Sequence, residues 1–345
     1  MNSSKPMRNP FRIGTRRPLV SVIMPSFNHE DFVEAAVRSV LDQSLRDLEI
    51  IAVDDASTDG TLARLSGISD PRLSVVALRS NREAHGRNLA LQRARGRYVA
   101  FQNSDDVWTP DKLERQVELL EAKRDSAACF TQVEIIGADG RPSPGTFLDG
   151  VFRSRALPRP EWLRLFFEAG NCLCISSALA RADLVRRIGG FRGRLVQLGD
   201  YDLWVRLAAF GDLLMVEAPL TRMRHPGGGN FSLPSPGHLR LSTIEHAEVL
   251  LRFAEEMLAR QLWNIFPETV DRAMVPGEAV LALALSVRDR SIAHDLFADH
   301  VIAAVLDDAA ARSRAVSRYG TAFIHDFLAL RAELETRRVT SGDAR

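Results

Sequence analysis

The sequence predicts an α/β fold in which a mostly parallel sheet is covered by helices and followed by an α-helical C-terminal region. Short apolar runs rich in β-branched residues alternate with helix-like segments through the first half of the chain, which is typical of parallel sheets. Polar clusters directly follow three of these runs. Beyond Ser235, apolar residues recur every three or four positions to about Arg338, and this spacing predicts helices.

The first half of the chain predicts strands that alternate with helices. The runs that predict buried strands are Val20–Met24, Leu48–Val53, Leu73–Leu78 and Tyr98–Gln102. A helix is expected after each of these strands. In chain order, the first begins near Asp31, the second begins near Leu62, the third spans about Arg87–Arg95, and the fourth begins at Pro110. Proline suits a first helical position because a backbone N–H there has no partner within the helix. Leu113, Val117 and Leu120 mark the buried face of this last helix.

The second half predicts less regular structure before the helical region. Glycine, proline and polar residues dominate Val133–Pro160, which we expect to form loops. Cys172–Ala180 has strand-like character, and Asp183–Ile188 predicts a short helix that Gly189 and Gly190 end. Tyr201–Phe210 predicts another helix, and HPGGGNF, from His225 to Phe231, predicts a flexible loop.

The composition is that of an ordinary globular protein, with 345 residues, 46% hydrophobic and 26% charged. A net charge of +1 argues against a dedicated nucleic-acid binder, which usually carries a strongly basic surface. Three cysteines are too few for a disulfide framework or a four-ligand zinc site, so we expect a reducing, cytoplasmic setting. No apolar run approaches the ~20 residues of a membrane-spanning helix.

Three polar clusters follow predicted strands: PSFNHED, DDASTDG and NSDD. In open parallel sheets, ligands bind at the carboxyl ends of the strands, so these clusters are expected to meet at one site. Asp105 and Asp106 lie side by side in the third cluster. Exposed carboxylate pairs are often solvated turns, but a pair fixed between a buried strand and a helix start can bind Mg²⁺ or Mn²⁺ through hard oxygen ligands.

Taken together, these stretches resemble a known enzyme family. VSVIMPSFNHEDFVEAAVRSVLDQSL, IIAVDDASTDGT and GRYVAFQNSDDVWTPDKLE are similar to the N-terminal half of the family-two glycosyltransferases, which have the glycosyltransferase A fold. The resemblance is close over Pro18–Lys123. It continues more loosely through GGF and LGDYDLWVRLA to about Ser232.

The resemblance implies a role for residues at each strand end. Pro25 and Phe27 match positions that line the nucleotide base, although a packed turn is the structural alternative for them. Asp55 matches the carboxylate that contacts uracil or ribose. Asp105 matches an acid that faces sugar or ribose hydroxyls, and Asp106 matches the acid that contacts Mn²⁺ or Mg²⁺ most directly.

The resemblance also implies a catalytic base. Asp200, in GDYDLW, is similar to the general base of inverting members; Asp202 is the competitor, but it begins the apolar helical pattern. Trp204 would either stack on a sugar or anchor its helix as a buried ring. His225 matches a histidine that completes the metal shell or touches the diphosphate, with a structural role as the alternative. Asn103 stands where relatives often have aspartate.

Basic residues without an apolar stretch predict a flexible tail over residues 1–17, and the helical spacing predicts a helical C-terminal region over 236–345. The resemblance makes 18–235 the glycosyltransferase A catalytic domain. The tail is expected to be solvated, with attraction to anionic lipid as the alternative. The helical region is expected to pack on the catalytic domain or to form a homodimer. A membrane-surface role is disfavoured because acids such as Glu245 and Glu248 lie along it.

The function implied is that of an inverting, metal-dependent glycosyltransferase. It would move a sugar from a nucleotide-diphosphate donor, expected to be a UDP-sugar, to a glycan or lipid-linked acceptor in bacterial surface polysaccharide synthesis. We expect it in the cytoplasm, with peripheral association at the inner face of the plasma membrane as an alternative, and without nucleic acid as a partner. Two other functions stay open: a catalytically silent scaffold of an envelope-assembly complex, and a nucleotidyltransferase, which would usually carry a glycine-rich phosphate loop after the first strand.

Overall fold

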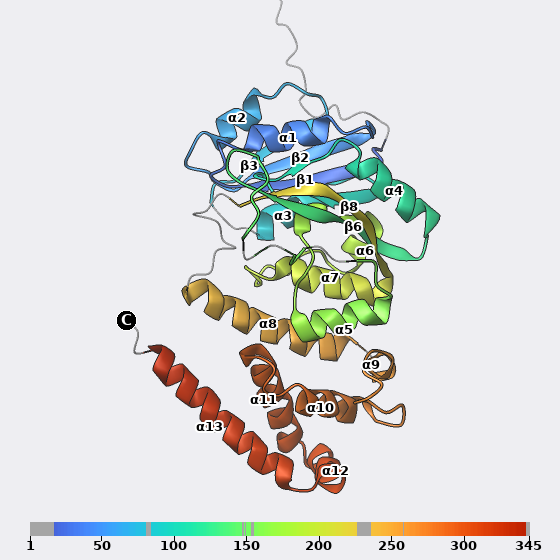
Figure 1. Cartoon of the computed structure of the whole chain (residues 1–345), viewed down its shortest axis with the longest axis vertical. Helices are drawn as coiled ribbons and strands as arrows, with labels where there is room; N and C mark the ends of the chain where they lie inside the picture. The colour runs from blue at the N-terminus through green and yellow to red at the C-terminus, as the bar shows by residue number, and fades with distance from the viewer. Residues whose placement is uncertain are drawn as a thin grey trace, which may run out of the picture.

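A helix-covered sheet forms one part of the molecule, and a group of helices lies against it (Figure 1). The computed structural model describes residues 17–80, 84–146, 148, 150–152, 155–225, 236–257 and 259–342. Nearly all of the predicted tail, 1–17, and of the loop predicted at 225–231 lie outside the described residues. Within the described residues, no helix is long and apolar enough to cross a membrane.

The sheet of the described residues has eight strands in the order β3-β2-β1-β4-β7-β6-β8-β5. Their bounds are β1 Val20–Ser26, β2 Leu48–Asp54, β3 Leu73–Ala77, β4 Tyr98–Phe101, β5 Val107–Trp108, β6 Ser126–Ile136, β7 Leu179–Arg181 and β8 Asp212–Arg224. Strands β3, β2, β1 and β4 are mutually parallel, as predicted. The other half is mixed, because β7 runs antiparallel to β4 and β6, while β6 and β8 are parallel.

Helices cover both faces of this sheet. Those within the α/β part are α1 Val33–Leu41, α2 Thr61–Gly67, α3 Ala84–Arg93, α4 Lys112–Ala122, α5 Arg159–Ala169, the 3₁₀ turn η1 Ile175–Ser177, α6 Ala182–Arg187 and α7 Gly199–Phe210. The C-terminal helices are α8 Pro236–Glu256, α9 Ala259–Ile265, α10 Pro276–Ser286, α11 Ile292–Asp307, α12 Ala309–Tyr319 and α13 Ala322–Gly342. Leu113, Val117 and Leu120 form the buried face of α4, as predicted.

Successive strand residues point to opposite faces and so belong to two separate cores. Val22 and Ile50 face the core beneath α1 and α4, together with Leu113. Ile23 and Ile51 face the other core, which continues through α3, α5 and α7 into the C-terminal helices. Figure 1 shows this arrangement, with α1, α2 and α4 on one side of the sheet and α7, α5 and α8 on the other.

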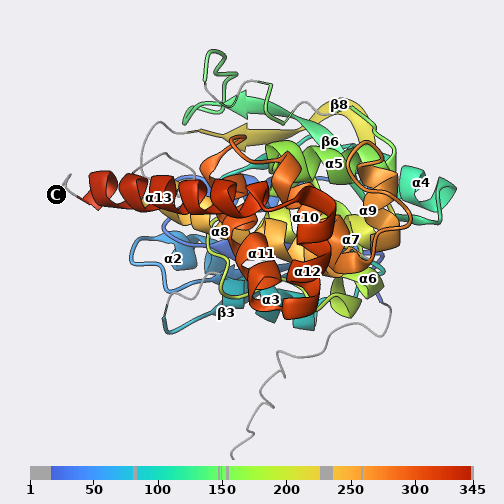
Figure 2. The same cartoon turned by 90° about the horizontal axis from the view of Figure 1, so that it is seen from below.

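Aromatic rings join the C-terminal helices to the α/β part. The ring of Phe167, on α5, lies 5.1 Å from that of Phe253, 5.2 Å from that of Phe266 and 5.5 Å from that of Phe297, measured between centroids. These partners come from α8, from the residue after α9 and from α11. Figure 2 shows the C-terminal helices gathered beneath the sheet. Packing on the α/β part, one of the expected roles of this region, is therefore confirmed.

The regular elements that were not predicted include β5, β6, β8 and α5. Strand β6 runs to Ile136 and enters the segment expected to form loops, because β8 pairs with it along its length. The strand expected over Cys172–Ala180 is largely wrong. Only Leu179–Arg181 pairs with neighbouring strands, while Ile175–Ser177 forms a 3₁₀ turn in which the Ser177 hydroxyl donates to the carbonyl of Cys174 at 2.7 Å.

Candidate active site

The three polar clusters meet at the carboxyl edge of β1, β2 and β4, as predicted. The Asn28 N–H donates to the Ser57 hydroxyl at 3.0 Å, and the Asn28 side-chain oxygen accepts from the Thr58 N–H at 2.8 Å. On the other side, His29 Nδ1 lies 2.7 Å from the Ser104 hydroxyl oxygen. Side-chain hydrogen bonds therefore tie the loop after β1 to the loops after both neighbouring strands.

The first two loops present the predicted donor-binding residues. Pro25 and Phe27 are half-buried at the end of β1, where Pro25 pairs with Val53 of β2. Asp55 is 4% exposed, and its N–H donates to the carbonyl of Ser26 at 2.8 Å. Its neighbour Asp54 accepts from the backbone N–H and the hydroxyl of Ser57, which fixes the turn.

The Asp105–Asp106 pair lies in the loop between β4 and β5 and is almost fully buried. One carboxylate oxygen of Asp106 accepts from the N–H of Arg224 at 2.9 Å, and the other accepts from the Ser176 hydroxyl. The Arg224 guanidinium donates to the backbone carbonyl of Asp105 at 2.9 Å. Burial and, next, the neighbouring Asp105 raise the pKa of Asp106 to about 8. A bound cation would stabilise both charged carboxylates and displace the proton that the raised pKa favours.

This donor set fits a divalent cation that is shared with a ligand. Mg²⁺ is commonly bound by one or two carboxylates while waters and phosphate oxygens complete its shell, and Asp105 and Asp106 supply such a pair. Among the described residues, no group of three or more His, Cys, Asp or Glu side chains could hold a metal ion. His225 is half-buried, and its N–H donates to the carbonyl of Ile136 at 2.8 Å.

Asp200 lies in the first turn of α7 and is half-buried. Its Oδ2 accepts from the Asn171 side-chain amide at 3.1 Å, and its Oδ1 accepts from the Tyr201 N–H at 2.7 Å. Burial raises the pKa of Asp200, while the positive charge of Arg87 opposes this shift. A carboxylate with a raised pKa takes up a proton more readily, which suits a general base.

The competing residue Asp202 has a structural role. It is 2% exposed and forms ion pairs with Arg206 at 2.5 Å and with Arg192 at 2.7 Å. Trp204 is fully buried against the rings of Phe101 and Phe130. Of the two roles considered for this tryptophan, the buried anchor is therefore the one observed.

The segment Asn171–Ser177 connects the two sites of negative charge, and sequence reasoning missed it. Ser176 donates to Asp106 at one end, and Asn171 donates to Asp200 at the other. Cys174 lies between them in the sequence. Burial and, next, the charges of Asp106 and Asp200 raise its pKa. The only signal in the sequence is the presence of polar residues within an otherwise apolar run.

A carboxylate from α8 holds the loop that leads to Asp200. The two carboxylate oxygens of Glu245 accept from the backbone N–H groups of Val196, Gln197 and Leu198, each at 2.8 Å. Glu245 is only 3% exposed, although the sequence suggested an acid on an open helix face. We call this arrangement the Glu245 clamp. Two further ion pairs, Arg192 with Glu256 and Arg194 with Glu248, join the same loop to α8.

The GGF motif is held by α3. The Asn88 side chain donates to the carbonyl of Phe191 at 2.7 Å and accepts from its N–H at 2.9 Å. Gly190 has φ of +68°, and a Cβ there would lie 2.7 Å from Asn88 Oδ1 and 2.8 Å from Leu91 Cδ2. Only glycine therefore fits this position without displacing Asn88.

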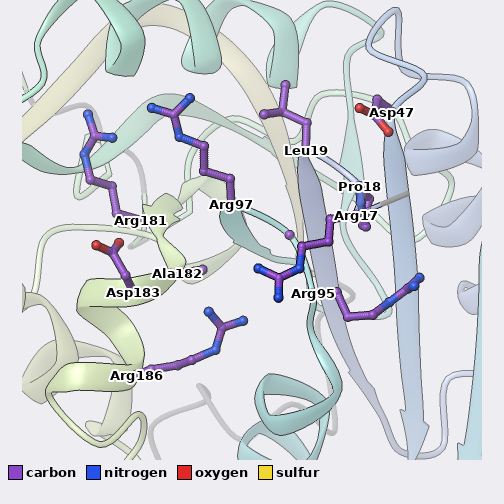
Figure 3. A pocket seen from close by; sticks show the side chains of 11 residues that line it. Arg17, Pro18, Leu19, Asp47, Arg95, Arg97, Arg181, Ala182, Asp183 and Arg186 are labelled. Carbon is purple, nitrogen blue, oxygen red and sulfur yellow. The ribbon is translucent and has the colours of Figure 1, made fainter. Parts of the chain in front are cut away.

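An arginine-rich hollow of about 550 Å³ lies on the opposite edge of the sheet (Figure 3). Arg17, Arg95, Arg97, Arg181 and Arg186 line it together with Asp47 and Asp183. Two of these arginines are paired with acids, Arg95 with Glu49 and Arg97 with Glu121. The residues before β1, β2 and β4 form this hollow, so it lies at the amino ends of the strands, away from the carboxylates described above.

Comparisons with known proteins agree on one family. Residues 21–187 match the family model described as Glycosyl transferase family 2. The protein TuaG of Bacillus subtilis (strain 168), named as a teichuronic acid biosynthesis glycosyltransferase, is 50% identical over 129 residues, or 36% of this chain and 51% of TuaG. WfgD of Escherichia coli, a UDP-Glc:alpha-D-GlcNAc-diphosphoundecaprenol beta-1,3-glucosyltransferase, is 39% identical over 119 residues, or 34% of this chain and 47% of WfgD. The chain therefore spans about half the length of these curated relatives.

A solved structure extends the likeness to the fold. The structure of S. aureus TarS 1–349 in complex with UDP-GlcNAc superimposes with a TM-score of 0.53 at 18% identity, covering 82% of this chain and 92% of that one. At this identity the likeness shows the fold alone. The predicted fold class is confirmed by it, including the helical region that follows the sheet.

Proposed function

We propose that this chain, which residues 21–187 place in glycosyltransferase family 2, is an inverting, metal-dependent enzyme. It transfers a sugar from a UDP-sugar to a glycan or lipid-linked acceptor in bacterial surface polysaccharide synthesis. The observation that carries the proposal is the link from Asp106 through Ser176 and Asn171 to Asp200. It connects a buried acidic pair and a separate carboxylate with a raised pKa to the two ends of one segment.

The donor is proposed to bind across the loops after β1, β2 and β4. Pro25 and Phe27 offer half-buried apolar surface for a base, and Asp55 offers a carboxylate for uracil or ribose. A UDP-linked donor is supported by the relatives, because WfgD is named for UDP-Glc and the TarS structure contains UDP-GlcNAc. The hydrogen bonds between these loops keep the contact groups in place before the donor arrives, which lowers the cost of binding.

Asp105 and Asp106 are proposed to hold Mg²⁺ or Mn²⁺ together with the donor diphosphate, and His225 is the proposed additional contact. Such an ion supplies positive charge for the departing diphosphate. Ser176 and the backbone N–H of Arg224 orient the Asp106 carboxylate. Because each carboxylate oxygen has further lone pairs, these two hydrogen bonds leave it able to bind a cation.

Asp200 is proposed to act as the general base. It accepts the proton of an acceptor hydroxyl while the hydroxyl oxygen forms a bond to the anomeric carbon. The bond from that carbon to the diphosphate oxygen breaks, and the diphosphate leaves with the electron pair. Attack from the face opposite the leaving group inverts the anomeric configuration. Asn171 and the Tyr201 N–H keep the carboxylate oriented during the transfer.

The test measures UDP release from a panel of UDP-sugars, with and without Mn²⁺, by the parent and by Asp106→Ala and Asp200→Ala. Asp212→Ala is the matched control, because Asp212 is an exposed aspartate at the start of β8. We expect the parent and the control to release UDP and both site variants to lose most of this activity. Unchanged activity in both site variants, or UDP binding that does not depend on metal in calorimetry, would contradict the proposal.

A further inference from the structure

We propose that a hollow beside α8 binds the acceptor as a neutral saccharide. The hollow has a volume of about 600 Å³ and lies between the end of α5, the start of α7, the first turns of α8 and the start of α11. We call it the α8 hollow. Its size falls within the roughly 300–1,000 Å³ of small-molecule sites in proteins. The inference rests on the proposed function, because it takes Asp200 as the base that the acceptor must reach.

The α8 hollow adjoins Asp200. Asn171, which lines the hollow, donates to Asp200 Oδ2 at 3.1 Å. Leu198 and Tyr201 also line the hollow, and both lie within two positions of Asp200 in the sequence. Asp200 does not itself line the hollow, so a saccharide there would reach the carboxylate past the Asn171 amide that holds it.

The hollow and the acidic pair contact opposite ends of one segment. The acidic pair contacts Ser176, whereas the hollow is lined by Asn171. An in-line displacement needs the nucleophile and the leaving group on opposite sides of the anomeric carbon. The acceptor would accordingly approach from the Asn171 end of the segment, while the diphosphate leaves at the Ser176 end.

The lining chemistry favours a neutral sugar over a nucleotide diphosphate. None of the described residues that line the hollow is an acid, a lysine or an arginine. Burial, followed by the charge of His294, lowers the pKa of His246 to about 4, so the imidazole in the lining is neutral at pH 7. The Ser242 hydroxyl can bond to a sugar hydroxyl, and Asn171 and Ser291, which already bond to Asp200 and His294, can each make one further hydrogen bond.

Two exposed apolar side chains and one polar atom without a hydrogen-bond partner also suit a saccharide in the hollow. Leu239 and Ile292 line the hollow and are 57% and 47% exposed, so they offer apolar contact to the C–H face of a sugar ring. Nε2 of His246 is buried and has no hydrogen-bond partner among the described residues. A buried polar atom without a partner costs stability, so a turn of the imidazole that brings Nε2 to the hollow would let a sugar hydroxyl become its partner.

The test is saturation-transfer NMR with the methyl glycosides of glucose, galactose and N-acetylglucosamine. Ser242→Trp fills the hollow from α8, and Leu239→Trp narrows its mouth at an exposed position that tolerates substitution. Ile244→Trp is the matched control, since Ile244 is 59% exposed on the same helix and does not line the hollow. Melting temperature and UDP affinity report whether each variant is folded.

We expect at least one glycoside to give saturation transfer with the parent and with Ile244→Trp, and at least a fivefold weaker signal with both hollow variants. Equal signals from a folded Ser242→Trp or Leu239→Trp, or no transfer to any of the three glycosides by the parent, would overturn the inference. UDP-sugar hydrolysis by the parent is measured separately. Its absence would refute the proposed function, whereas hydrolysis with unaltered glycoside binding in the variants would refute only the assignment of the hollow.

Discussion

Replacing Glu245 tests whether a C-terminal helix positions the loop that leads to Asp200, the proposed base. Glu245→Ala removes the carboxylate that accepts three backbone N–H groups at 2.8 Å, immediately before α7. Because the side chain is only 3% exposed, little water is present to replace it. The loop should therefore lose its fixed conformation, and Asp200, two residues beyond Leu198, should lose its position.

The magnitude follows from the hydrogen bonds. A hydrogen bond to a charged group contributes about 1.5–3 kcal/mol, and because bonds to one carboxylate do not add fully, we expect a total loss of about 4 kcal/mol. For 345 residues, an unfolding entropy of about 2.1 cal/mol/K per residue converts this loss to a melting temperature lower by about 5 °C. Glu245→Gln keeps one acceptor oxygen, so its loss should be about half as large.

The assay combines calorimetric melting with steady-state kinetics of UDP release. We expect kcat of Glu245→Ala to fall at least tenfold while UDP affinity stays within twofold, because the Glu245 carboxylate bonds to the loop before α7 and not to the loops proposed to bind the donor. Glu255→Ala is the matched control, since Glu255 is an exposed glutamate on the same helix. A Glu245→Ala protein that melted within 1 °C of the control and kept its kcat would refute the positioning role.

Three further predictions concern single residues. Asp200→Asn should lower kcat by about 10²- to 10⁴-fold with UDP binding intact, and an unchanged kcat would contradict the role of general base. Because burial raises the pKa of Asp200, kcat of the parent should begin to fall, as pH is lowered, at a pH above the ordinary pKa of aspartate. Gly190→Ala should lower stability by more than the ~1–2 kcal/mol of left-handed strain, because its Cβ would also meet Asn88. Gly189→Ala is the control for backbone strain alone, because Gly189 has a similar φ of +82° and a Cβ there would have no neighbour within 4 Å. Equal losses of unfolding free energy for the two variants in chemical denaturation would contradict the clash with Asn88. Burial lowers the pKa of His246 to about 4 in the folded chain. Below pH 6.5 the unfolded chain therefore binds a proton that the folded chain does not, and the free energy of unfolding should fall by about 3 kcal/mol between pH 6.5 and pH 4. Melting curves of His246→Phe should show a smaller slope, with His294, whose pKa burial also lowers, contributing to the remainder. An unaltered slope would show that another group causes it.

The sequence predicted those parts of the fold that short-range patterns determine. Strands β1, β2 and β4 are continuous apolar runs because both faces of the sheet are covered, and such runs are visible without a structure. Polar clusters at their ends predicted where the carboxylates meet. Strands β6 and β8 were missed because their pairing with each other, rather than their own composition, makes them strands.

The site residues that were missed act through distant backbone groups. Glu245 is one of several acids on α8, and nothing in its own neighbourhood indicates that its carboxylate accepts from a loop nearly 50 positions earlier. Ser176 was taken for part of a strand and Asn171 was given no role, although each holds one proposed catalytic carboxylate. Such roles depend on tertiary contacts, which residue spacing does not encode.

The aromatic contacts of Phe167 have a consequence for synthesis of the chain. Phe167 is made early, but its partners Phe253, Phe266 and Phe297 follow up to roughly 130 residues later. At translation rates of about 5–20 residues per second, that interval is roughly 6–26 s. During this time Phe167 and the apolar face of α5 around it lack the helices that cover them. The nascent chain should therefore need protection from aggregation until α11 leaves the ribosome.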